Sequence, residues 1–192
     1  PDDYFRGDWF LKFQRTNVIN GAGIYETGLR TQISIGQVIS RNSTNSPIFP
    51  SVGSKILLSA EVAGANLVGT TNFYKLGFKS EAYKSLDNAG KLVLASLFDI
   101  ESISSLSSDN YVPPNELFYM GGSGLSYNTV ALRGYDDRSV GPVNIVRSPV
   151  GGRFLMKYGV ELRYSLSQDP IPIFLMVFAE AGNLWSSFKT AD

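Results

Sequence analysis

The chain has 192 residues and a formal net charge of zero, with 17 basic and 17 acidic side chains, no histidine and no cysteine. Without histidine or cysteine it cannot hold a Ser-His-Asp triad, a thiol nucleophile, a disulfide framework or a zinc finger. The balanced charge gives no electrostatic reason to expect nucleic acid as a partner, and the length alone suggests one domain or two small ones.

Apolar and polar side chains alternate along most of the chain, whereas helical periodicity is nearly absent. In residues 25–37, for example, Ile33 and Ile35 share one face while Gln32 and Ser34 share the other. Alternation with period two predicts a strand with two unlike faces. In chain order, strands are predicted over 9–15, 25–37, 54–62, 73–86, 91–101, 153–165 and 173–181.

These strands, about seven in number, have one face that is almost purely apolar and aromatic and another that mixes charge with glycine. Several reach the length of about nine residues or more that a tilted transmembrane strand needs. The pattern therefore predicts an all-β fold, an antiparallel transmembrane β-barrel with lipid outside and a polar lumen inside. The alternative is a soluble β-rich module with one wet face per sheet, which predicts shorter strands and lysine on the solvent face.

The predicted connections differ greatly in length. Residues 87–90, Asp-Asn-Ala-Gly, form a tight turn, whereas 41–53 and 104–152 are long and rich in Ser, Asn, Gly and Pro. Short turns at one end and long loops at the other are typical of outer-membrane barrels. A connection as long as 104–152 is otherwise unusual, and such segments are usually functional.

Four features in and after this longest loop follow one another in a specific order. They are Gly121-Gly122, the tip Leu132-Arg133-Gly134-Tyr135, the acidic Glu161 on the next strand, and the strand end Phe178-Ala179-Glu180-Ala181-Gly182-Asn183-Leu184-Trp185. Over residues 117–185 the chain resembles the bacterial surface antigen barrels, the BamA branch of the outer-membrane assembly and two-partner-secretion superfamily. The Arg-Gly-aromatic tripeptide alone has no value as a signature, but the four features in this order and spacing are specific.

The resemblance implies that residues 104–152 fold back into the barrel lumen, where Arg133 lies against Glu161 and Glu180. The alternation independently places both glutamates on the inward face of their strands. A guanidinium offers a rigid fork of donors for two carboxylates, and an unpaired arginine in a narrow lumen would be costly. Gly134 would allow a tight turn or a close approach to the wall, and Tyr135 would pack on the wall and bond through its hydroxyl. We call Leu132 to Tyr135 the loop latch; the resemblance adds the loop and strand-end glycines Gly121, Gly122 and Gly182.

For function, the resemblance implies an insertase that folds and inserts β-barrel proteins into the bacterial outer membrane without ATP. Its partners would be outer-membrane protein clients, lipoproteins of an assembly complex and the lipid bilayer. Two alternatives stay open: a two-partner-secretion or translocation-and-assembly pore of the same superfamily, and a soluble β-rich binding module. The family's barrel has about sixteen strands, an even number, as is usual for closed bacterial barrels. Residues 1–192 are therefore expected to be part of one barrel domain, without the periplasmic repeat domains and the closing strands.

No enzymatic activity, metal or cofactor is expected. The lumen carboxylates of Asp99, Glu101, Glu161 and Glu180 could suggest a glycosidase pair, but they are better explained as balancing Lys91, Arg153, Lys157 and Arg163 across the interior. Asp109, Asp136 and Asp137 lack the spacing of a calcium loop. The glycines at 121, 122 and 124 lack the following Lys-Ser/Thr of a phosphate-binding loop.

Overall fold

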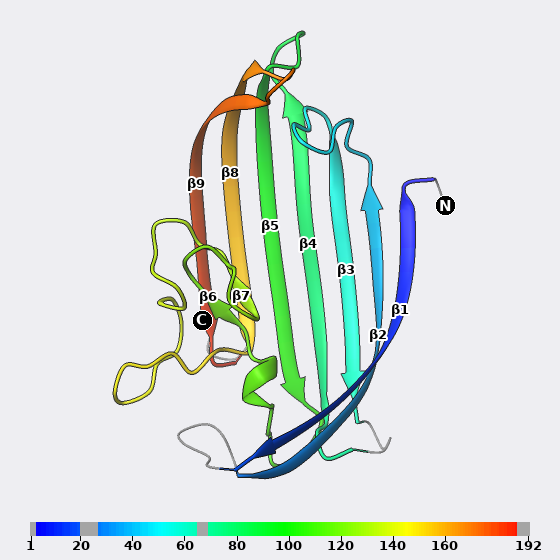
Figure 1. Ribbon diagram of the computed structural model, residues 1–192, viewed down its shortest axis with the longest axis vertical. Coiled ribbons are helices and arrows are strands. Elements are labelled where there is room, and N and C mark those ends of the chain that lie inside the picture. The colour runs from blue at the N-terminus through cyan, green and yellow to red at the C-terminus, as the bar shows by residue number, and fades with distance from the viewer. Residues whose placement is uncertain (1–2, 20–26, 65–68, 188–192) are drawn as a thin grey trace.

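The computed structural model describes residues 3–19, 27–64 and 69–187, which form one antiparallel sheet with a long loop against one face (Figure 1). The long strands are β1 (Phe5–Val18), β2 (Gly28–Asn42), β3 (Gly53–Ala63), β4 (Phe73–Ser85), β5 (Leu92–Ser105), β8 (Phe154–Ser167) and β9 (Ile173–Trp185). The sheet order is β1-β2-β3-β4-β5-β8-β9, so each long strand pairs with the next one along the chain. The predicted all-β, antiparallel, seven-stranded fold is confirmed.

Six of the seven long strands are longer than the alternation indicated, and the seven range from 11 residues in β3 to 15 in β2. The exception is β4, which ends at Ser85, one residue before its predicted end. The predicted start of the second strand, residues 25 and 26, lies outside the described residues. At the end of β5 the pattern fades because serines occupy both faces, yet backbone pairing continues as far as Ser105 opposite Phe73. Among the described residues, no helix is long and apolar enough to cross a membrane.

The two faces of the sheet differ as predicted. On the face that we call the outer face, β1 exposes Trp9, Leu11 and Phe13 by 70%, 81% and 70%. The register continues this apolar surface across the neighbouring strands, since Leu11 lies opposite Ile35, which lies opposite Val62. A soluble protein rarely exposes so large an apolar surface, so this face is suited to lipid and disfavours the soluble-module alternative.

A charge on the outer face should destabilise the protein in a bilayer. Leu58 lies near the middle of β3, exposed on the outer face, whereas its neighbour Leu57 points to the opposite face and pairs in register with Lys79. In the full-length protein in lipid vesicles, Leu58→Glu is expected to lower the unfolding free energy by roughly 2 kcal/mol. The matched control Leu57→Glu should change it much less, because the new carboxylate faces Lys79. Equal losses for the two variants, measured by denaturant unfolding, would contradict the lipid-facing assignment.

The connections alternate between the two ends of the sheet. Residues 43–52, 86–91 and 168–172 lie at the upper end in Figure 1, and the loop 106–153 starts and finishes at the lower end. The expected separation of long loops from short turns is therefore wrong for 41–53, which shares its end with the tight turn at 87–90. This loop is long because it folds back over the sheet and buries Phe49 against Tyr83, Val93 and Ala95.

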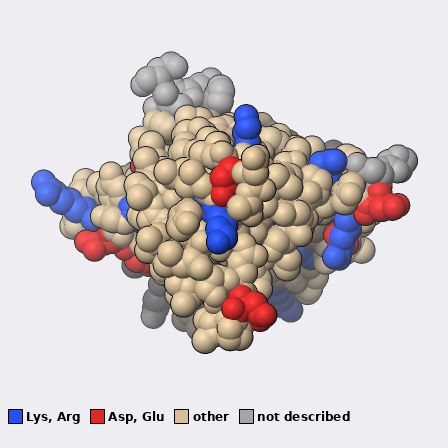
Figure 2. Space-filling model, turned by 90° about the horizontal axis from the view of Figure 1, so that it is seen from above, with Lys and Arg blue, Asp and Glu red and all other residues tan. Residues whose placement is uncertain are grey.

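Charged side chains are few and dispersed over the upper end of the molecule. Figure 2 shows this end as mostly uncharged, with lysines, arginines and carboxylates as separate spots rather than a patch of one sign. The surface that the structure describes at this end therefore offers no strong electrostatic guide to a charged partner.

The long loop, residues 106–153, has more internal structure than a sequence without periodicity suggests. It contains the 3-10 turn η1 (Pro114–Glu116) and the short parallel pair β6 (Tyr119–Met120) and β7 (Thr129–Val130). Its apolar side chains pack on the inner face of the sheet, the face opposite Trp9 and Leu11. The shared core consists of Val112, Phe118, Met120 and Leu132 from the loop with Ala63, Phe73, Ile103, Leu155 and Leu184 from the strands.

Candidate functional site

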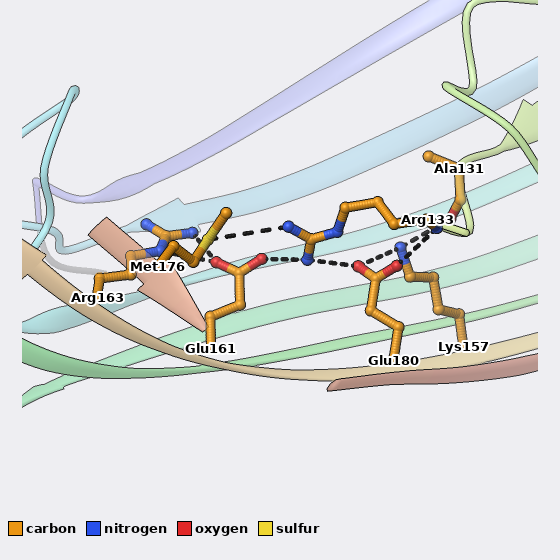
Figure 3. Close-up of polar contacts among 7 residues, drawn as sticks. All are labelled: Ala131, Arg133, Lys157, Glu161, Arg163, Met176 and Glu180. Atoms are coloured by element: carbon orange, nitrogen blue, oxygen red, sulfur yellow. Dashed lines mark hydrogen bonds and ion pairs between the residues drawn. The ribbon is translucent and has the colours of Figure 1, made fainter. Parts of the chain in front are cut away.

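The tip of the long loop places Arg133 over strands β8 and β9 (Figure 3). Its Nη2 donates to Glu180 Oε1 at 2.7 Å and also to Glu161 Oε1, while its backbone N–H donates to Glu180 Oε2 at 3.0 Å. The structure thus brings together the arginine and the two glutamates that the resemblance paired. Nη2 alone contacts both carboxylates. The expected arrangement, in which the two terminal nitrogens of the guanidinium each bind one carboxylate, is therefore not the one observed.

The strand register explains why the two glutamates can share one cation. Glu161 lies opposite Phe178 and Glu180 lies opposite Gly159, so the carboxylates are offset by two residues on adjacent strands and point to the same inner face. A Cβ at Gly159 would lie 3.5 Å from Glu180 Cγ, an ordinary van der Waals contact, so the Glu180 side chain passes directly over Gly159. The gap between the two carboxylates is the place that Arg133 occupies.

Two cations from the sheet complete the cluster. Lys157 Nζ lies 3.0 Å from Glu180 Oε1 and also donates to the carbonyl of Ala131 in the loop at 2.7 Å. Arg163 Nε donates to Glu161 Oε2 at 2.7 Å. The side chains of Glu161 and Glu180 are only 4% and 5% exposed, and a buried carboxylate is strongly destabilising unless it is paired. Each glutamate therefore has one cationic partner on the sheet, Arg163 for Glu161 and Lys157 for Glu180. Both glutamates also bind Arg133 of the loop.

The other predicted charge pairs are partly wrong. Asp99 and Glu101 pair with Lys79, at 3.1 and 2.6 Å, rather than with Lys91. Arg153 instead donates to the side chain and the carbonyl of Asn110, both at 2.7 Å. Pairing follows the cross-strand register, in which Lys79 lies directly opposite Asp99, and alternation within single strands does not fix that register.

An aromatic ring supports the guanidinium. Arg133 Cζ lies 3.7 Å from the centroid of the Phe178 ring, a distance at which a cation is attracted to the ring face. Burial on its own would lower the pKa of Arg133, but the hydrogen bonds to Glu180 and Glu161 outweigh it and raise the pKa above its ordinary value. The loop therefore presents a permanent positive charge to the two strands.

The other members of the loop latch behave differently from one another. Leu132 is buried in the shared core of loop and sheet. Gly134 has a φ of +87°, which serves the tight turn, but a Cβ there would meet nothing within 4 Å, so it makes no close approach to the wall. The expectation that Tyr135 packs on the wall is wrong, because this residue is 56% exposed.

The loop and strand-end glycines permit close packing of the backbone. Gly121 has a φ of +126°, and a Cβ there would lie 2.3 Å from the carbonyl oxygen of Asp136. Gly122 also has a positive φ, of +61°. Gly182 on β9 leaves room for Met120, whose Sδ would lie 3.1 Å from a Cβ at that position. These glycines allow the loop to fold on itself and to lie close to β9.

A second charged residue of the loop, Glu116, was not predicted. It is only 1% exposed and contacts the sheet at a different place from Arg133. A signal was present in the sequence, because Glu116 is the single acidic residue in the otherwise uncharged run 112–118. An acidic residue buried by apolar neighbours needs a cationic partner, but the sequence does not show which lysine provides it.

The geometry of this site fixes a loop in place. In the part of the chain that the structure describes, Glu161 contacts Arg133 and Arg163, and Glu180 contacts Arg133 and Lys157. Carboxylates that each bind two cations are suited to hold elements together. Together with Leu132 and Met120 in the shared core, they attach the loop to the last two strands of the sheet.

Comparisons with known proteins agree with this description. The family model of the Omp85 superfamily domain matches residues 9–192, and no curated protein sequence gives a significant match. Among solved structures, the crystal structure of BamA from Haemophilus ducreyi lacking POTRA domains 1–3 matches with a TM-score of 0.71 and 22% identity. The match covers 86% of this chain and 32% of that chain. The sheet and its loop therefore have the fold of part of a BamA barrel.

Proposed function

Because the chain belongs to the Omp85 superfamily, we propose that it forms part of the barrel of an outer-membrane protein insertase, which folds and inserts β-barrel proteins into the bacterial outer membrane without ATP. The observation that carries this proposal is the contact of Arg133 with Glu161 and Glu180 on a sheet with the fold of part of a BamA barrel. Its partners are outer-membrane protein clients, the lipid bilayer and lipoproteins of an assembly complex.

In this proposal the described segment supplies the wall and the loop, and it needs no catalytic side chain. The outer face contacts lipid, as its exposed tryptophan, leucine and phenylalanine side chains on β1 require. The loop latch pins the long loop to β8 and β9 and stiffens that side of the barrel. A stiff wall would confine opening to the seam, where an incoming client strand pairs with an exposed sheet edge by β-augmentation.

The activity is tested with the purified full-length protein in phosphatidylcholine–phosphatidylethanolamine vesicles, to which a urea-unfolded outer-membrane barrel is added without nucleotide. We expect the client to fold roughly tenfold faster than in vesicles that hold an unrelated barrel of similar size, a difference of about 1.4 kcal/mol in the barrier. Equal rates would contradict the insertase. A client that becomes protease-protected inside the vesicles without inserting would instead favour a secretion pore of the same superfamily.

A further inference from the structure

The loop has a second attachment to the sheet, on the side away from Arg133. Glu116 of η1 accepts from Lys12 Nζ at 2.5 Å and from Gln32 Nε2 at 3.1 Å, and Lys75 Nζ lies 3.7 Å from its other oxygen. These partners come from β1, β2 and β4. A single buried carboxylate of the loop thus joins three strands, none of which contributes to the cluster around Arg133.

The two attachments have opposite polarity. At β8 and β9 a cation of the loop lies between carboxylates of the wall, whereas at β1 to β4 a carboxylate of the loop lies among cations of the wall. In Figure 1 the lower parts of β1 and β2 bend across toward η1, as the contacts of Glu116 require. The loop therefore spans the inner face and is held at both sides of the sheet.

Local structure fixes the direction of the Glu116 side chain. The prolines at 113 and 114 begin the 3-10 turn, in which the Glu116 N–H donates to the Pro113 carbonyl at 2.9 Å. The neighbouring Phe118 ring lies 4.7 Å beneath the ammonium of Lys75. Asn128 Nδ2 donates to the Asn115 carbonyl at 2.7 Å and so links residues before β7 to the same turn. The position of Glu116 therefore determines the position of the part of the loop around η1.

We propose that Glu116 is a second positioning residue. It sets the position of the part of the loop around η1 (Pro114–Glu116), which we call the η1 half, and it does so independently of Arg133. The inference rests on these contacts alone and holds whichever polypeptide the barrel handles. Removing the charge of Glu116 would take away the carboxylate that Lys12 and Lys75 share and leave Glu61 as the nearby carboxylate. The two ammonium groups would then repel one another more strongly, and their repulsion would displace η1 from the wall.

The test measures spin-label distances in the full-length protein on a cysteine-free background; the present chain has no cysteine of its own. One label on the exposed Asn88, in the turn between β4 and β5, serves as the reference. The second label is placed on the exposed Leu125, three residues before Asn128, whose side chain binds the η1 turn, or on the exposed Asp136, three residues after Arg133. Glu116→Gln is expected to broaden the 88–125 distribution at least twofold. The 88–136 distribution should broaden much less, although Ser126 donates a hydrogen bond to Asp137 and so links the two labelled segments.

The control is Glu101→Gln, which removes a glutamate of the same face whose partner, Lys79 at 2.6 Å, belongs to the wall itself. It should change neither distribution, and heat-modifiable gel mobility reports whether each barrel is folded. If Glu116→Gln does not fold, Lys12→Gln decides, since Lys12 is partly exposed; it should give the same selective broadening. Unchanged distributions in the folded variant, or equal broadening at 125 and 136, would overturn the proposal.

Discussion

Replacing Arg133 with alanine in the full-length protein is expected to free the loop tip from β8 and β9 while the barrel still forms. The variant loses hydrogen bonds to Glu161 and Glu180, and such bonds to charged groups contribute about 1.5–3 kcal/mol each. Because Arg133 is partly exposed and the effects are not additive, we expect a total loss of about 3 kcal/mol. Lys157 and Arg163 continue to compensate the glutamates, so the wall itself should survive.

The measurement is the temperature at which the folded form converts to the slower-migrating unfolded form on a gel. The control is Arg147→Ala, which removes an exposed arginine of the same loop. Arg133→Ala should convert at a clearly lower temperature than the wild type, and Arg147→Ala at the wild-type temperature. If the two variants behaved alike, the contact of Arg133 with the strands would not stabilise the barrel.

Gly121→Ala is expected to disturb the loop more than the same substitution at Gly134. Both residues have a positive φ, and an unfavourable backbone region costs about 1–3 kcal/mol for a residue with a Cβ. At Gly134 this is the whole cost, since nothing lies within 4 Å of the new atom. At Gly121 the new Cβ would also lie 2.3 Å from the backbone oxygen of Asp136, so the segment 136–139 must move. We expect a total loss above about 3 kcal/mol for Gly121→Ala.

Limited proteolysis of the folded full-length protein measures this difference directly. The loop of Gly121→Ala should be cleaved many times faster than that of the wild type, and the loop of Gly134→Ala only slightly faster. Cleavage that is equally fast in the two variants would mean that the close approach between Gly121 and Asp136 does not hold the loop together.

The alternation of side chains was enough to locate all seven long strands and to orient their faces. The alternation did not predict where the strands end. Residues such as Ser102 and Ser105 give no contrast between an apolar and a polar face, although backbone pairing continues through them. The alternation also left the pairing of charges open, since Lys79 meets Asp99 through the register of two strands rather than through any pattern within one.

The resemblance to a known family predicted the cluster of one arginine and two glutamates, but not the rest of the site. Arg133, Glu161 and Glu180 lie together because the loop tip and the strand register place them so. The expected burial of Tyr135 was wrong because an aromatic residue next to a glycine turn can lie on either side of the loop, and here Tyr135 is 56% exposed. Glu116 was missed because a single acidic residue in an irregular loop has no periodicity, and its partners come from three distant strands.

In the function proposed above, the chain is a wall of an insertase, and its loop must be latched to β8 and β9 for clients to fold. The most direct measurement compares ATP-free client folding in vesicles by the full-length wild type, Arg133→Ala and Arg147→Ala, at equal amounts of folded protein. We expect the wild type and Arg147→Ala to accelerate client folding equally, and Arg133→Ala to lose most of the acceleration. A folded Arg133→Ala protein that works at the wild-type rate would contradict this expectation.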